Sequence, residues 1–238
     1  MVNMDVLTTT EQEIHIVVKV INTPTSWLLS SIYDSPKFKE RQVFWDNIYS
    51  VFVLHNLPWA IVGDFNDVLN GLEKLGGNPI NLHCSMAYSN CKNFCNMIDL
   101  GFFGPIFTWT NRREITALIQ QRIDRCWANP SWNLAFSDAN VTHLPRTSSV
   151  HCSLLLCLVD NIQSKLERPF RFKKMWIGHP GFQQVVDNAW NLSPSLQLAI
   201  SSFKSLATSW NKDVFGSVFA QKRKLLAIIG GLQKALAS

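Results

Sequence analysis

The sequence predicts an α+β fold, a sheet sandwich with helices outside, followed by a helical appendage. Two observations lead to this prediction. Short strand patterns alternate with two helical patterns up to about residue 160, whereas from Phe182 to Leu236 the apolar residues recur every three or four positions. Of the 238 residues, 47% are hydrophobic and 16% are charged, so the chain can bury a sizeable core.

The first elements are predicted to form a β-α-β unit. Glu13 to Val20 has the alternating apolar residues of a strand, Trp27 to Tyr33 is predicted as a second strand, and the turn residues 22–26 between them indicate a hairpin. From Phe38 to Leu54 the apolar residues fall at helical spacing, and Leu57-Pro58 ends that helix. This order predicts a helix packed on one face of a sheet.

A short apolar run followed by two polar residues lies at the centre of the prediction. Trp59 to Val62 is typical of a buried strand, Gly63 interrupts it, and Asp64 and Asn66 follow. Residues i and i+2 of an extended chain point the same way, so both side chains are expected to face one site. A carboxylate and an amide there could orient a water nucleophile or hold a phosphate near a hard cation. An Asx turn that only ends the strand is the alternative.

A second helix and several short strands complete the region before residue 160. The helix is predicted from about Ser85 to Leu100, with Gly101 as its C-terminal cap. Its inward side chains are expected to be Met86, Phe94, Met97 and Ile98. The predicted strands are 107–109, 117–119, 122–128, 141–144 and 151–159.

A change of character after Asp160 predicts a boundary near residue 162, with one domain at 1–162 and a second segment at 163–238. The second segment begins with a basic stretch that contains aromatic residues, Arg168 to Lys174. The amphipathic helical pattern that follows predicts a surface that needs a protein partner rather than a membrane.

Composition limits the classes of function. The formal net charge of +5 permits a polyanionic partner and requires none. No apolar run approaches the ~18 residues needed to cross a bilayer, so no membrane span is predicted. The six cysteines lack a C-x-x-C spacing and predict free thiols in an intracellular, reducing compartment. Cys91, Cys95 and His83 leave a zinc site open as an alternative.

Six short motifs occur in a set order along the chain. They are Ser31-Ile32-Tyr33-Asp34-Ser35-Pro36, Gly63-Asp64-Phe65-Asn66, Glu73-Lys74-Leu75-Gly76-Gly77, Phe107-Thr108-Trp109-Thr110-Asn111, Arg122-Ile123-Asp124-Arg125 and Ser148-Ser149-Val150-His151-Cys152. Over about residues 11–160 the chain resembles the endonuclease region of plant LINE-type (non-LTR) retrotransposons. That region belongs to the endonuclease/exonuclease/phosphatase superfamily, which includes deoxyribonuclease I, and the resemblance implies a partial four-layer α/β/β/α sandwich. The segment from Arg168 resembles the one that links nuclease to reverse transcriptase in those elements.

The resemblance implies phosphodiester hydrolysis of DNA by an activated water and a divalent metal, usually Mg²⁺, and a nuclear location. Asp64 matches the Asp that orients or deprotonates the water and can ligate the metal, and Asn66 matches the Asn beside it. Tyr33 matches a Tyr that helps hold the phosphate. His151 matches the His that stabilises charge on the phosphoryl oxygens, and Asp124 matches the Asp that orients this His.

Two departures from the family pattern predict an inactive remnant. Where the family has Asp directly before the His, this chain has Val150, whose isopropyl group cannot ligate a cation. The family's strand with the metal-ligating Glu lies upstream of the Tyr motif, and Glu11 and Glu13 lie in the wrong context to replace that Glu. The domain is therefore expected to be truncated at its N-terminus, with an open sheet edge beside residues 14–20 or 27–33. Losing one electrostatic contributor of this kind costs a factor on the order of 10² to 10³ in rate.

Two alternatives remain open. The chain could be an active divalent-metal nuclease or phosphatase with a rebuilt metal site. It could instead be a non-catalytic nucleic-acid-binding protein whose affinity falls steeply with salt. The basic residues considered for that role are Arg112, Arg113, Arg122, Arg125, Arg168, Arg171, Lys173 and Lys174.

Overall fold

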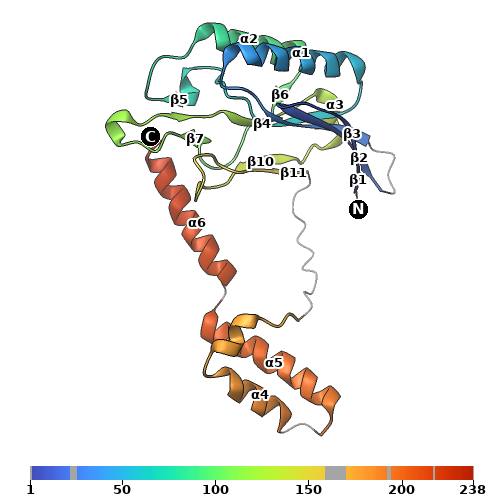
Figure 1. The fold of residues 1–238 in the computed structure, drawn as a ribbon, viewed down its shortest axis with the longest axis vertical. Coiled ribbons are helices and arrows are strands. Elements are labelled where there is room, and N and C mark those ends of the chain that lie inside the picture. The colour runs from blue at the N-terminus through green and yellow to red at the C-terminus, as the bar shows by residue number, and fades with distance from the viewer. Residues whose placement is uncertain (1, 22–25, 159–169, 192–193, 217, 238) are drawn as a thin grey trace. The chain divides into compact units, whose positions relative to one another are not determined.

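The computed structural model describes residues 2–21, 26–158, 170–191, 194–216 and 218–237 (Figure 1). The chain divides into two compact units, one made of Met1–Ile162 with Leu226–Ser238 and the other of Gln163–Leu225. The predicted boundary near residue 162 and the turn at 22–25 lie outside the described residues. The grouping of 226–238 with the first unit was not part of the sequence-based division.

A six-stranded sheet forms the centre of the first unit. Its strand order is β1-β2-β3-β4-β9-β6, with β3 and β4 parallel and the other neighbours antiparallel. The antiparallel pairing therefore places the last residue of β4 beside the first residue of β9. The strands are β1 (Val2–Thr9), β2 (Glu13–Val20), β3 (Ser26–Tyr33), β4 (Trp59–Asp64), β6 (Ile98–Asp99) and β9 (Asp124–Ala128).

The predicted hairpin of β2 and β3 is confirmed, and its outer edge is not open. β1 pairs antiparallel with β2 from Val2 opposite Val20 to Thr9 opposite Ile14. The sequence analysis missed β1 although Val2, Met4 and Val6 alternate with polar residues. Every residue of β1 is solvent-exposed, so the strand is held by its backbone hydrogen bonds rather than by burial.

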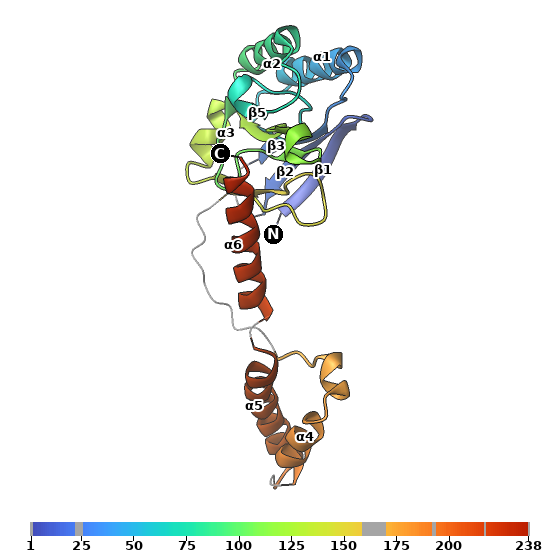
Figure 2. The same ribbon diagram turned by 90° about the vertical axis from the view of Figure 1, so that its left-hand side faces the viewer.

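Two helices cover one face of this sheet (Figures 1 and 2). α1 (Phe38–Leu54) has the predicted bounds and buries Phe44 and Ile48. α2 (Leu82–Phe94) starts after Asn81, whose side chain accepts from the first backbone N–H groups. The core between helices and sheet contains Leu28, Ile32, Phe44, Trp45, Ile48, Val51, Trp59, Ile61, Phe65, Tyr88, Cys91, Cys95, Met97 and Trp127.

The predicted end of α2 at Leu100 was wrong. Asn96 adopts a left-handed backbone conformation (φ 51°), and the N–H of Met97 donates to the carbonyl of Lys92, so the helix closes six residues earlier. The helix also turns a different face inward: Met86 and Phe94 are exposed, and Tyr88 is fully buried. The sequence-based prediction placed large side chains at helical spacing in the core, whereas the structure packs smaller cysteines there beside Tyr88.

The other face of the sheet packs against a smaller layer. Val18, Trp27 and Trp132 form a buried cluster there with partly buried Leu156. The elements on this side are β10 (Asn140–His143), β11 (Leu154–Cys157) and α3 (Pro130–Ala135). The α+β class with more than one sheet is therefore confirmed.

A three-stranded sheet lies at one end of the first unit, in the order β5-β8-β7. The strand predicted at 107–109 is displaced to Trp109 and Thr110, and residues 115–117 form a 3-10 turn (η2) where a strand was predicted at 117–119. The strands of this sheet are β5 (Lys74–Leu75), β7 (Trp109–Thr110) and β8 (Gln120–Gln121), and a 3-10 turn η1 (Gly71–Glu73) leads into β5.

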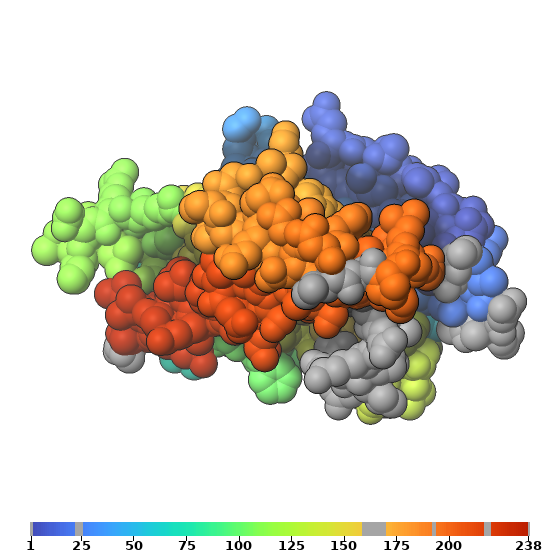
Figure 3. Space-filling view, turned by 90° about the horizontal axis from the view of Figure 1, so that it is seen from below, coloured from blue at the N-terminus to red at the C-terminus, as the bar shows by residue number. Residues whose placement is uncertain are grey.

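The second unit is helical and closes around an aromatic cluster of Trp176, Phe182, Phe203 and Trp210. Ring centroids in this cluster lie 5.6 to 6.3 Å apart. Its surface is coloured orange in Figure 3. The elements are η3 (Lys174–Gly178), α4 (Phe182–Trp190) and α5 (Leu196–Phe215), and the residues of α6 (Val218–Ala235) are divided between this unit and the first.

Two predictions from composition can be compared with the structure. Among the described residues, no helix is both long and apolar enough to span a membrane. The six cysteines are free thiols, as predicted. Cys91 and Cys95 belong to the hydrophobic core, and His83 contacts the ring of Phe38 instead, so the zinc alternative has no support among the described residues.

Candidate functional site

Asp64 is the last residue of β4, so its side chain lies at the end of that strand. Its Oδ1 accepts the backbone N–H of Asn66 at 2.8 Å, which is an Asx turn. Asn66 has a left-handed backbone (φ 48°), so it does not continue the extended strand. The extended backbone predicted for the two residues was therefore wrong, and an Asx turn ends the strand.

Asn66 nevertheless contacts Asp64. Its Nδ2 donates to the carbonyl of Asp34 at 2.6 Å and to Oδ2 of Asp64 at 3.3 Å. Both oxygens of Asp64 are thus held by Asn66, one through the backbone and one through the side chain. The turn fixes the orientation of the carboxylate.

Asp124 lies opposite Asp64 because β4 and β9 pair antiparallel with these two residues in register. The buried hydroxyl of Thr108 accepts the N–H groups of both Ile123 and Asp124 at 3.0 Å, which fixes the start of β9. Sequence reasoning missed this role of Thr108. A hydroxyl inside the otherwise apolar Phe107-Thr108-Trp109 motif was the available signal.

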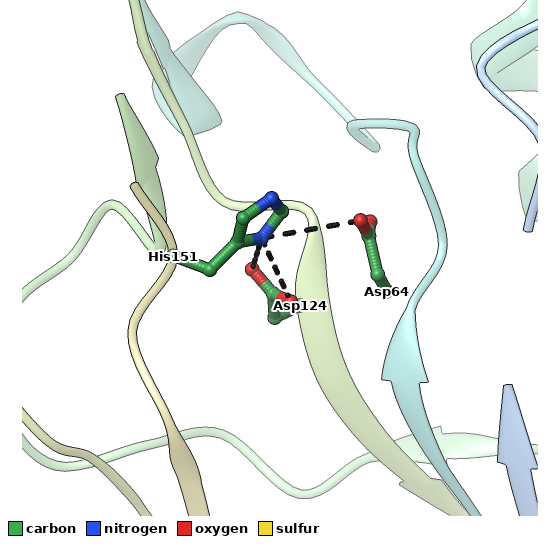
Figure 4. Close-up of side chains that lie close together, drawn as sticks. All are labelled: Asp64, Asp124 and His151. Carbon is green, nitrogen blue, oxygen red and sulfur yellow. Dashed lines mark hydrogen bonds and ion pairs between the residues drawn. The ribbon is translucent and has the colours of Figure 1, made fainter. Parts of the chain in front are cut away.

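His151 joins the two carboxylates from a separate segment (Figure 4). Its backbone bridges to Trp109 of β7, and its Nδ1 lies 3.1 and 3.3 Å from the two oxygens of Asp124. The same nitrogen lies 3.9 Å from Oδ2 of Asp64. The other ring nitrogen points away from both carboxylates (Figure 4).

The electrostatics of this cluster follow from two acids and one base in a partly buried place. Burial, followed by repulsion from Asp124, raises the pKa of Asp64 to about 6. The hydrogen bond that His151 Nδ1 donates to the Asp124 carboxylate is the main cause of a raised pKa for His151, which favours the imidazolium. Behind the site, burial raises the pKa of Asp34 to about 8.

Tyr33 ends β3 in register with Asp64 on the neighbouring parallel strand. Its side chain is 62% exposed, so it is accessible to a ligand above the end of the sheet. Of the five predicted catalytic residues, the structure brings Asp64, Asn66, Asp124 and His151 into contact through hydrogen bonds or the close ion pair, and Tyr33 adjoins them through the strand register.

Three side chains of the site offer ligand atoms for a divalent cation. Asp64, Asp124 and His151 place ligand atoms within 4.8 Å of one another, the single such group found in the described part of the chain. Mg²⁺ is bound through one or two carboxylates and retains several waters, so Asp64 suits it, and a cation would relieve the repulsion that raises the pKa of this residue. Asp124 is engaged by His151. The residues fit a hard cation held mainly by Asp64.

Three residues stand in the sequence near the positions where the family has further acidic groups, and none of them supplies a ligand to the cation. Val150, directly before His151, is half-buried, and its carbonyl accepts the N–H of Thr110. Glu11 is exposed. Glu13 is buried, and its Oε1 accepts from Asn47 of α1 at 2.6 Å, so one oxygen of this carboxylate is engaged by the helix. None of the three belongs to the Asp64 group.

Two of the arginines proposed to bind nucleic acid are instead buried, and that expectation was wrong for them. Arg125 is completely inaccessible and pairs with Glu73 and Asp99. Arg122 pairs with the same two acids at 3.0 and 2.7 Å. The ring of Phe102 covers Arg122. Buried guanidinium groups are stable only with such partners, and these partners leave them out of reach of a nucleic acid.

The other basic residues have different surroundings. Arg112 and Arg113 are exposed on the loop between β7 and β8. Arg171, Lys173 and Lys174 are exposed on the helical unit. Arg168 lies outside the described residues.

Residues 5–155 match the sequence pattern of the endonuclease/exonuclease/phosphatase family. The fold is similar to that of the endonuclease domain of TRAS1, a telomere-specific non-LTR retrotransposon, at 16% identity and a TM-score of 0.51, covering 64% of this chain and 68% of that one. A 3′ phosphatase from Neisseria, NExo, bound to a product DNA hairpin, gives 18% identity and a TM-score of 0.43, with 64% and 68% covered. At 16% identity the likeness to TRAS1 concerns the fold alone. No curated protein sequence matches this chain.

Proposed function

Because the chain belongs to the endonuclease/exonuclease/phosphatase family, we propose that it is a degenerate relative of a LINE-type retrotransposon endonuclease that no longer cleaves DNA. One observation carries the proposal: the cluster of Asp64, Asp124 and His151 is assembled, yet Asp124 is engaged by His151, which leaves Asp64 as the main carboxylate for a cation. The plant origin suggested by the motifs belongs to the same proposal.

The assembled part of the site supports the ancestry. Asp64, with a pKa of about 6, is ionised near neutral pH and remains basic enough to take a proton from a water. His151 holds its proton through Asp124 and turns its second nitrogen outward, where an imidazolium can donate to a phosphoryl oxygen. Tyr33 would contact the phosphate from the end of β3.

The ligand set supports the loss of activity. Asp64, with Asp124 second, would hold the cation, and a cation bound there would polarise a phosphoryl oxygen and acidify a bound water. Asp124 cannot leave His151 without lowering the pKa of the imidazole. Val150 supplies no oxygen where the family has a carboxylate, and the carboxylate of Glu13 is bonded to Asn47. One free carboxylate binds Mg²⁺ weakly at ordinary concentrations.

A plasmid-nicking assay tests this proposal. Supercoiled DNA is incubated with the purified chain and 5–10 mM Mg²⁺ or Mn²⁺ (on the order of the excess needed to saturate a weak site). The expected result is nicking no faster than in the buffer control. In parallel, the midpoint of thermal unfolding is followed as Mn²⁺ is added, and Asp64→Ala should abolish any upward shift.

The controls separate true activity from contamination. Asp64→Ala and His151→Ala remove the two groups assigned to the water and the phosphate, whereas Asp138→Ala changes an exposed carboxylate elsewhere. Cleavage by the wild type and by Asp138→Ala, lost in the other two variants, would overturn the inactive assignment and establish the alternative, an active nuclease with a rebuilt metal site. Hydrolysis of a phosphomonoester with the same variant pattern would establish a phosphatase.

A further inference from the structure

A pocket of about 330 Å³ lies in the first unit, where β7, β8 and the end of α6 meet. None of the groups that define it belongs to the cluster of Asp64, Asp124 and His151. Its lining residues are Thr110, Arg112, Arg113, Ile115, Leu118, Gln120, Arg146, Thr147, Gln233 and Leu236.

The lining has a strong positive charge. Three of the ten residues are arginines, and none is Asp or Glu. Arg146 is 9% exposed, and its Nη1 donates to the carbonyl of Phe107 at 2.6 Å, so its guanidinium is fixed. Arg112 is held by the carbonyl of Ser149 at 2.6 Å. Three cations that share a concave wall repel one another, and an anion between them would remove that cost.

A buried amide without a partner also lines the pocket. Gln120 is 2% exposed, and its Oε1 has no hydrogen-bond partner among the described residues. An unpaired buried acceptor costs about 1–3 kcal/mol, so its presence in a native fold calls for an explanation. A ligand that carries a donor would satisfy this oxygen.

The end of α6 shapes the opposite wall. The side chain of Gln233 donates to the carbonyl of Arg146 at 2.8 Å and accepts from its N–H at 3.1 Å. These two hydrogen bonds fix the helix end against the segment that leads to His151. Leu236 thereby joins the lining beside Ile115 and Leu118. The pocket therefore combines a cationic part, one amide and an apolar wall.

We propose that this pocket binds a single nucleotide, with its phosphate on Arg112, Arg113 and Arg146 and its base against the apolar wall and Gln120. Guanidinium groups bind phosphate through paired, charge-assisted hydrogen bonds. A volume of about 330 Å³ is at the small end of ligand sites, which limits the occupant to about one nucleotide. The nucleotide is either free or part of a single strand.

The proposal is tested by calorimetric titration of the full chain in EDTA, so that the Asp64 site and any metal play no part. Adenosine 5′-monophosphate, adenosine and inorganic phosphate are titrated separately. The monophosphate is expected to bind at least about tenfold more tightly than either fragment, because only it makes both sets of contacts. A result in which inorganic phosphate binds as tightly as the monophosphate, or in which none binds, would overturn the assignment.

Two variants locate the binding. Arg113→Ala, at an exposed position, should weaken the monophosphate and inorganic phosphate alike by about tenfold. Gln120→Leu should weaken the monophosphate by about the same factor and leave inorganic phosphate unchanged. Arg171→Ala, an exposed arginine of the helical unit, is the matched control and should change neither. Unchanged binding in Arg113→Ala and Gln120→Leu would refute the pocket as the site.

A competition experiment identifies the source of the nucleotide. A short single-stranded oligodeoxynucleotide is added to the chain preloaded with adenosine 5′-monophosphate. Displacement of the monophosphate assigns the pocket to a nucleotide within a strand, and retention of it assigns the pocket to a free nucleotide. Neither result depends on whether the chain hydrolyses DNA, so this proposal and the proposed loss of nuclease activity can fail separately.

Discussion

Two ionic clusters lie on opposite sides of β9, and they differ in charge balance. Arg125 and Asp124 are consecutive strand residues and so point to opposite faces. On the Arg125 side, two arginines face two acids, Glu73 and Asp99, in four ion pairs of at most 3.1 Å. On the Asp124 side, two carboxylates face one histidine, at 3.1 and 3.9 Å.

The difference in charge balance separates a cluster that stabilises the fold from one that costs stability. The arginines lower the pKa values of Glu73 and Asp99 despite the burial of both acids. All four groups of this cluster are therefore ionised, and their charges sum to zero. The pKa of Asp64 is raised instead, so ionising it opposes folding. A charge arrangement that costs stability is typical of a binding or catalytic site.

The largest expected effect comes from breaking the balanced cluster. Arg125→Ala would leave Glu73 and Asp99 buried with a single guanidinium between them, which should lower the free energy of unfolding by about 3–5 kcal/mol. Urea unfolding followed by tryptophan fluorescence measures this change. Arg113→Ala removes an exposed arginine and should stay within about 0.5 kcal/mol. A similarly small change for Arg125→Ala would mean that the four ion pairs contribute little to the fold.

The second effect has the opposite sign and concerns the unbalanced cluster. A carboxyl whose folded-state pKa is raised from 3.8 to about 6 favours folding when protonated, and this contribution is lost as pH rises through about 6. Asp64→Asn avoids the penalty and keeps an oxygen for the N–H of Asn66. It should therefore stabilise the chain by about 1–3 kcal/mol at pH 7.5.

The pH dependence distinguishes this explanation from a packing effect. At pH 3.5 both side chains are neutral, so the gain from Asp64→Asn should vanish. Asp138→Asn, at an exposed position, should change the free energy of unfolding by less than about 0.5 kcal/mol at either pH. If Asp64→Asn stabilised equally at both pH values, desolvation of the carboxylate would not be the cause.

A smaller effect is expected for the titration of His151, followed by the NMR signals of its ring protons. Its pKa should lie above 6.5 in the wild type and fall in Asp124→Asn, which removes the main cause of the raised value. Since the folded state binds this proton more tightly, the stabilisation is complete below pH 6.5 and is lost as pH rises through the raised pKa. Buried His15, with a pKa of about 4, is an internal reference that Asp124→Asn should leave unchanged. A pKa of His151 unaffected by Asp124→Asn would contradict the pairing.

Sequence reasoning mostly succeeded where the deciding interactions are local, although it missed the left-handed residue Asn96 that ends α2, and it failed where the partners are distant in the chain. The bounds of α1 follow from its own apolar spacing, and the Asx turn at Asp64 involves a residue two positions away. The burial of Arg122 and Arg125 depends on Glu73, which lies 49 and 52 positions away. The contact of Gln233 with Arg146 spans 87 positions. A guanidinium group therefore could not be classed as surface or core from its neighbours in sequence.

The smallest expected effect is that of restoring the family's carboxylate with Val150→Asp. The new carboxylate would be adjacent to His151 in the sequence, and a third acid near a cluster with more negative than positive charge should raise the pKa of Asp64 further. Glu13 would remain bonded to Asn47, and Asp124 would remain bonded to His151. Nicking of supercoiled plasmid in Mg²⁺ should therefore stay at the level of the buffer control. Metal-dependent nicking by Val150→Asp that disappears in the double variant with His151→Ala would show instead that one missing carboxylate accounts for the whole loss of activity.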